Sequence, residues 1–148
     1  MRLFPTTSSR ASTRTKSEEK PGLRYLVDTH VAVWFVTGDK QLSPTVLDMM
    51  LREQAEPFVS IASLWELAIK RGLGKLTANL MMLRETLAEQ KFGFLPITLD
   101  HAMEAGDLDH HHRDPFDRML ITQAKIEGMT IITHDRAFEP YGVPIVWT

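Results

Sequence analysis

Short apolar runs alternate with longer segments of mixed polarity along the chain from residue 23 onward. The apolar runs predict strands, at residues 23–27, 58–61, 94–97, 130–133 and 144–147. The segments between them predict helices, at residues 31–36, 43–54, 64–71, 79–90, 100–106 and 115–128. Ser43-Pro44 and Asp114-Pro115 are typical of helix starts. Strands that alternate with helices form parallel sheets with both faces covered. The pattern therefore predicts an α/β fold: a three-layer α/β/α sandwich around a central parallel sheet of about five strands.

The first 22 residues have a different composition. They are rich in Ser, Thr and Arg, show no apolar period, and end in Pro21-Gly22 just before the first apolar run. This composition is typical of a disordered segment. We expect a disordered extension over residues 1–22 and a single folded domain over residues 23–148. An Arg- and Ser-rich start also resembles an organelle transit peptide, but it shows no apolar face.

Composition narrows the classes of protein to which the chain can belong. With 148 residues, 43% of them hydrophobic, the chain can bury the core of one domain. The lack of cysteine excludes disulfides, thiolate zinc sites and thiol nucleophiles, and it suits the reducing cytoplasm. No apolar run is long enough to cross a bilayer, so we expect a soluble, cytoplasmic protein.

The charge is unevenly divided between the extension and the domain. Residues 1–22 hold five Lys/Arg and two Glu, so the domain carries the remaining 12 Lys/Arg and 17 Asp/Glu. If a domain with this excess of acid binds a polyanion such as RNA, it needs cations to offset the charge of its own carboxylates.

Four acidic residues follow strands or open helices. Asp28 comes directly after the first predicted strand, and Asp135 comes two residues after the strand at 130–133. Asp117 lies in the first turn of a helix, and Glu66 lies early in the helix after the second strand. Ligands of open α/β sheets bind beyond the carboxyl ends of the strands. We therefore expect the four carboxylates to share that edge.

Each acid also has a local explanation. Asp28, Asp114 and Asp135 can cap helices or turns, while Glu66 can pair with Lys70 four residues later. Taken together, however, several carboxylates on one edge repel each other unless a cation lies between them. Oxygen ligands without thiols suit Mg²⁺ or Mn²⁺. Such ions activate water and stabilise the leaving oxygen in phosphodiester hydrolysis.

Four segments carry a family resemblance, in this order: YLVDTHVAVWF (25–35), SIASLWELAIKRGLGKL (60–76), HRDPFDRMLITQAKIEG (112–128) and TIITHDRAFEPYGV (130–143). Through them the chain resembles the PIN-domain ribonucleases, and among these the toxins of VapBC-type toxin–antitoxin pairs. The resemblance covers almost all of the chain after residue 22.

The resemblance implies a function and a set of site residues. It implies a Mg²⁺- or Mn²⁺-dependent endoribonuclease that hydrolyses RNA with metal-activated water, forms a homodimer and is inhibited by a small antitoxin protein. The implied catalytic and metal-binding residues are Asp28, Glu66, Asp117 and Asp135. Asp114 is interpreted mainly as a helix cap, with a possible supporting role at the site.

Three further residues are candidates for contact with RNA. Thr133 lies two residues before Asp135, where its hydroxyl could hydrogen-bond a site carboxylate. Arg118 could hold a phosphate, and His112 could line the site. A zinc site in the run at residues 110–112 is not expected, because adjacent side chains point in different directions and no second ligand pair supports it. Trp34 and Trp65 are expected in the core.

Two alternative functions remain open at this point. One is a catalytically silent PIN-like module that binds RNA or protein without turnover. The other is a different Mg²⁺-dependent phosphoryl-transfer enzyme, such as a phosphatase. Phosphatases that form a phospho-aspartate need a second Asp two residues after the nucleophile, whereas Asp28 is followed by Thr29 and His30.

Overall fold

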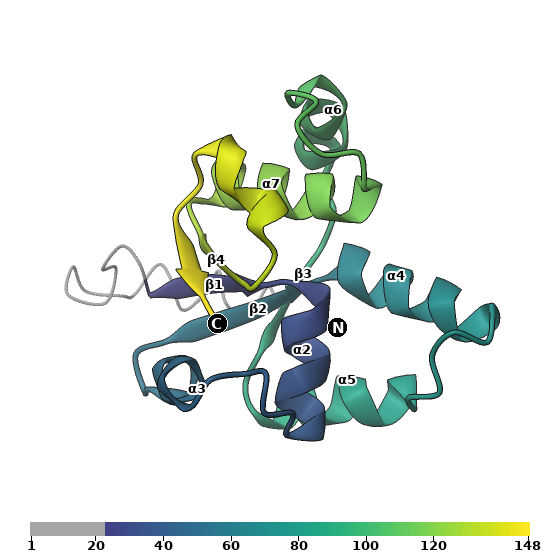
Figure 1. The fold of residues 1–148 in the computed structure, drawn as a ribbon, viewed down its shortest axis with the longest axis vertical. Coiled ribbons are helices and arrows are strands. Elements are labelled where there is room, and N and C mark those ends of the chain that lie inside the picture. Colours follow the sequence, from purple (N-terminus) through teal and green to yellow (C-terminus); the bar gives the residue numbers. More distant parts are fainter. Residues whose placement is uncertain (1–22) are drawn as a thin grey trace.

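The central element of the computed structural model, which describes residues 23–148, is a sheet of five parallel strands. The strands are β1 (Arg24–Val27), β2 (Glu56–Ser60), β3 (Gly93–Leu95), β4 (Thr130–Thr133) and β5 (Ile145–Trp147). Their order across the sheet is β3-β2-β1-β4-β5, and every neighbouring pair is parallel (Figure 1). This confirms the predicted parallel sheet. The extension expected over residues 1–22 lies outside the described residues.

Helices cover both faces of the sheet (Figure 1). One layer contains α2 (Thr29–Thr37), α3 (Pro44–Leu51) and α5 (Leu80–Glu89). The other layer contains α7 (Pro115–Glu127) and the 3₁₀ helix η2 (Arg136–Tyr141), with α6 (Leu99–Asp107) packed on α7. Helix α4 (Ile61–Gly72) contacts both α2 and α7. The three-layer sandwich is therefore confirmed. No helix within residues 23–148 combines the length and the apolar character that a membrane span requires.

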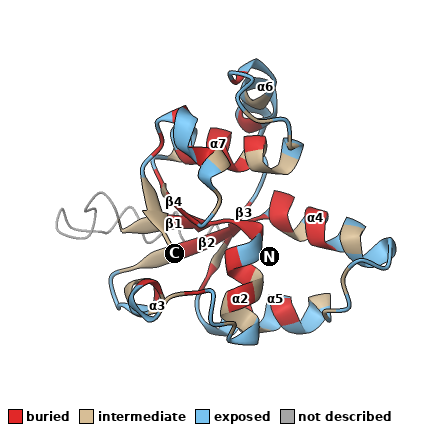
Figure 2. Cartoon of the chain, in the orientation of Figure 1, coloured by how far each residue is buried: buried red, intermediate tan, exposed pale blue. Residues whose placement is uncertain are grey.

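The two cores lie on opposite faces of the same strands (Figure 2). Leu26 and Ile131 pack toward α7, whereas Val27 and Ile132 pack toward α2, and all four side chains are fully buried. Successive strand residues point to opposite faces. Both orientations must therefore be apolar when helices cover both sides, which explains the continuous apolar runs in the sequence.

Local capping sets where several helices begin. The side chains of Ser43 and Asp114 accept hydrogen bonds from backbone N–H groups in the first turns of α3 and α7, as their sequence context predicts. The second strand ends earlier than we expected. Ser60 caps α4 through the N–H group of Ala62, so Ile61 already belongs to the helix.

One expectation about the large apolar side chains needs correction. Trp34 is buried as expected, but Trp65 is 59% exposed, although its ring contacts that of Phe116 at the start of α7. Met81 and Met82, at the start of α5, are also more than half exposed. These residues leave apolar surface on the described domain.

Candidate metal site at the carboxyl edge of the sheet

The strand order reverses at β1. The chain passes from β1 to β2 and β3 on one side, then continues with β4 and β5 on the other side. Ligands of open parallel sheets bind at such a switch point, beyond the carboxyl ends of the strands. Asp28 directly follows β1, and Asp135 follows β4 by two residues. The backbone N–H of Asp28 donates to the carbonyl of Ile132 at 3.0 Å. The two strand ends therefore lie side by side at the switch point.

Thr133 links the two acids at this edge. Its hydroxyl donates a hydrogen bond to Asp28 Oδ2, and the same oxygen accepts one from the backbone N–H of Asp135 at 3.0 Å. Asp28 also caps α2 through the N–H of Val31, and Asp135 caps η2 through the N–H of Ala137. The hydrogen bond that we expected from Thr133 to a site carboxylate is present. A contact between Thr133 and RNA stays a prediction.

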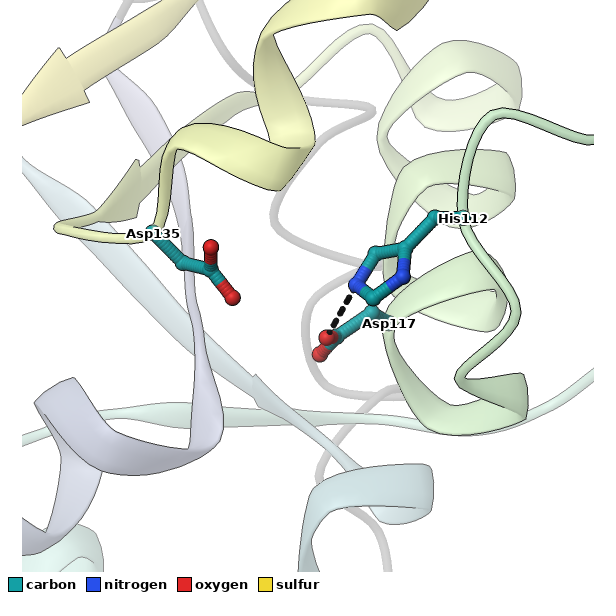
Figure 3. Close-up of side chains that lie close together, drawn as sticks. All are labelled: His112, Asp117 and Asp135. Carbon is teal, nitrogen blue, oxygen red and sulfur yellow. Dashed lines mark hydrogen bonds and ion pairs between the residues drawn. The ribbon is translucent and has the colours of Figure 1, made fainter.

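Asp117 and His112 face Asp135 across this edge (Figure 3). His112 Nε2 lies 2.9 Å from Asp117 Oδ2, at hydrogen-bond distance. One ligand atom from each of His112, Asp117 and Asp135 lies within 4.8 Å of the other two. Two of these residues come from the start of α7 and the preceding loop, and the third follows β4. The fold thus brings together side chains that are distant in the sequence.

The charge environment of Asp117 is unusual. Its pKa is raised from 3.8 to about 7, mainly because the carboxyl group is buried and next because Asp114 is negatively charged. The charge of Asp28 raises the pKa further, while the hydrogen bond and charge of His112 lower it. The contact with His112 therefore only partly compensates the carboxylate form of Asp117. A divalent cation would complete the compensation, so these residues fit a metal ion.

Glu66 is hydrogen-bonded to Thr29, the residue that follows Asp28. Its Oε1 accepts a hydrogen bond from the hydroxyl of Thr29 at 2.8 Å, and its Oε2 lies 3.2 Å from Lys70 Nζ. The pairing with Lys70 is the one that the sequence suggested. Among residues 23–148, Glu66 and Asp28 lie outside the group of three with closely spaced ligand atoms. Their role as metal ligands stays a prediction.

Arg118 has a structural role that the sequence did not indicate. Its side chain is buried, and its guanidinium donates four hydrogen bonds, of 2.8–3.2 Å. The acceptors are the carbonyl oxygens of Ala105, Leu108, Asp109 and His112. We expected Arg118 to hold an RNA phosphate, but four of its five N–H donors are used inside the domain. The structure therefore favours a role in holding the loop before α7.

Sequence reasoning missed Thr29, although its position next to Asp28 placed it at the same edge. His112 was expected to line the site, and the structure adds its close contact with Asp117. The sequence shows only that His112 lies five residues before Asp117. The two side chains meet because of the conformation of the loop and of the first turn of α7 between them.

Comparison with known proteins identifies the family. The model of the PIN domain matches residues 25–143, which is most of the chain. The chain belongs to the PIN-domain family. A search of curated proteins finds no match.

Solved structures confirm the PIN fold. The DNA-bound VapBC2 complex of Rickettsia felis has a chain that matches with 16% identity and a TM-score of 0.66, over 84% of this chain and 98% of that one. DNA-bound VapBC of Salmonella typhimurium matches with 19% identity and a TM-score of 0.63, over the same shares of the two chains. FitAcB of Neisseria gonorrhoeae matches with 19% identity and a TM-score of 0.59, over 82% and 95%. At these identities the likeness shows a shared fold.

Proposed function

We propose that this PIN domain is a Mg²⁺- or Mn²⁺-dependent endoribonuclease and the toxin of a VapBC-type toxin–antitoxin pair. The observation that carries the proposal is the convergence of Asp117 and Asp135 at the switch point of the sheet, beside the end of β1 that carries Asp28. The carboxylates come from separate segments, and their repulsion is the condition that a bound cation relieves.

The residues of the edge have distinct parts in this proposal. Asp135, and Asp117 once it has lost its proton, offer carboxylate oxygens to the cation, with Asp28 and Glu66 completing the acidic set. A divalent cation bound there lowers the pKa of a water molecule and neutralises charge on a phosphodiester. Thr133 holds the carboxylate of Asp28 in one orientation.

The proposal includes an antitoxin and a second copy of the chain as partners. The similar structures are VapBC, FitAB and other toxin–antitoxin complexes. The described domain also exposes apolar side chains that protein contacts would cover, including Trp65 and Leu73 on or just after α4 and Leu99 and Met103 on α6. We propose that the protein acts in the cytoplasm, where its RNA substrate is found.

Cleavage of RNA by the full chain tests the enzymatic proposal. The wild type is compared with Asp28→Asn and with the control Asp48→Asn, an exposed acid on α3. Each is assayed on a mixed single-stranded and structured RNA pool with Mg²⁺, with Mn²⁺ or with excess chelator. We expect cleavage by the wild type and the control only when metal is present, and none by Asp28→Asn.

Circular dichroism and thermal melting show whether the Asp28→Asn variant stays folded. Undiminished cleavage by this variant, or by the wild type in chelator, would refute the mechanism. Metal and RNA binding without any cleavage by the wild type would show instead a silent binding module.

A further inference from the structure

We propose that His112 Nε2 is itself a metal ligand, so that the site is a mixed nitrogen and oxygen site that prefers a first-row transition ion over Mg²⁺. This inference rests on the proposed function, because it assumes that a cation binds at this edge. It goes beyond an all-carboxylate site in naming a ligand that sets which ion is bound.

The spacing of the side-chain atoms supports direct ligation. In an octahedral site with bonds of about 2.1 Å, neighbouring ligand atoms are about 3.0 Å apart and opposite ones about 4.2 Å apart. The 2.9 Å between His112 Nε2 and Asp117 Oδ2 matches a neighbouring pair. The ligand atom of Asp135 lies within 4.8 Å of both. Small side-chain movements would therefore place all three around one ion.

The loop that carries His112 is held by buried groups. Arg118 donates hydrogen bonds to the carbonyls of Asp109 and His112 in the loop and to those of Ala105 and Leu108 at the end of α6. The hydroxyl of Tyr141 donates to the carbonyl of Asp109 at 3.0 Å. The ring of His112 also makes a T-shaped contact with that of Phe138, which is fully buried. The imidazole is thus positioned before any ion binds, which is the property that a ligand needs.

The figure shows the ring on the side of Asp117 that faces Asp135 (Figure 3). The ring nitrogen that contacts Asp117 in the metal-free structure is Nε2. In the ion-bound form Nε2 would be unprotonated, the ring proton would lie on Nδ1, and the cation would take the place of the hydrogen bond.

A nitrogen ligand changes the preference for metals. Mg²⁺ takes oxygen ligands almost exclusively, whereas divalent first-row transition ions bind sites with nitrogen ligands in an order that begins with Mn²⁺. Because Mn²⁺ is the weakest of that series, it is the strictest ion with which to test the preference. It is also paramagnetic, so its ligands are directly observable.

Pulsed electron paramagnetic resonance of Mn²⁺ bound to the full chain tests the ligand. We expect a nitrogen coupling of a directly bound imidazole in the wild type, with the change in pattern that ¹⁵N-labelled histidine produces. The coupling should be lost in His112→Asn and kept in His110→Asn, an exposed histidine of the same loop. Metal-free thermal melting of both variants shows whether each is folded.

Calorimetric titration with Mg²⁺ and Mn²⁺ tests the preference. We expect His112→Asn to lower the affinity for Mn²⁺ by about tenfold or more and the affinity for Mg²⁺ by much less. Mn²⁺ that binds the wild type without nitrogen coupling, or that binds His112→Asn equally well, would overturn this inference and leave the proposed function intact. Failure of the wild type to bind either ion would overturn both.

Discussion

Removing the charge of Asp117 should stabilise the metal-free protein at alkaline pH. The carboxyl group is buried next to Asp114, and its pKa is about 7 instead of 3.8. The folded state therefore binds a proton that the unfolded chain has already lost. In Asp117→Asn the side chain cannot ionise, and the amide oxygen can still accept a hydrogen bond from His112. The variant thus removes the ionisation penalty and keeps the contact.

The size of the effect follows from linkage. Because the folded pKa lies above the unfolded one, the stability contributed by the neutral carboxyl is complete below pH 3.8 and is lost as the pH rises toward about 7. From pH 5 to pH 8 this loss spans roughly 2 pKa units, or about 2–3 kcal/mol at 1.36 kcal/mol per unit. The side chain is 20% exposed, so solvent reduces the expected loss to about 1–2 kcal/mol.

Urea denaturation in excess chelator at pH 5, 6.5 and 8 measures this difference. We expect the free energy of unfolding of Asp117→Asn to gain about 1–2 kcal/mol on the wild type between pH 5 and 8. The control Asp48→Asn, at an exposed position, should show no such gain. Repeating the comparison in a His112→Asn background removes the titration of the imidazole. A difference that does not vary with pH, or that favours the wild type at pH 8, would refute the reasoning.

Three further substitutions test the packing and hydrogen bonds around the site. Gly93→Ala should destabilise the domain by about 1–3 kcal/mol, because a Cβ atom there would lie 2.5 Å from the ring of Phe58; equal urea midpoints for variant and wild type would contradict this. Thr133→Val should cost about 1–3 kcal/mol by removing the donor to the buried carboxylate of Asp28; the prediction fails if the urea midpoint of the variant equals that of the wild type. Arg118→Met should speed hydrogen exchange selectively over residues 105–112, because four carbonyls at the end of α6 and in the following loop lose their donors. An equal change in exchange rate across the whole domain would argue against the proposed role of Arg118.

Much of the architecture follows from local sequence signals. The strands are apolar runs because helices cover both faces of the sheet, and Ser43-Pro44 and Asp114-Pro115 start helices through caps that need only neighbouring residues. Asp28 and Asp135 were placed at one edge by their position after strands, which parallel topology turns into spatial proximity. These features depend on periodicity and on contacts between residues close in the chain, so a single sequence contains them.

The order β3-β2-β1-β4-β5, the burial of Arg118 and the meeting of His112 with Asp117 and Asp135 were decided only by the tertiary structure. The sequence alone left Arg118 as a phosphate ligand and Trp65 as a core residue, because a charge or an aromatic ring looks the same in the chain whether it lies inside or outside. The raised pKa of Asp117 likewise depends on burial by distant segments. Local patterns determine where elements start and end, while packing between distant elements determines what each side chain contacts.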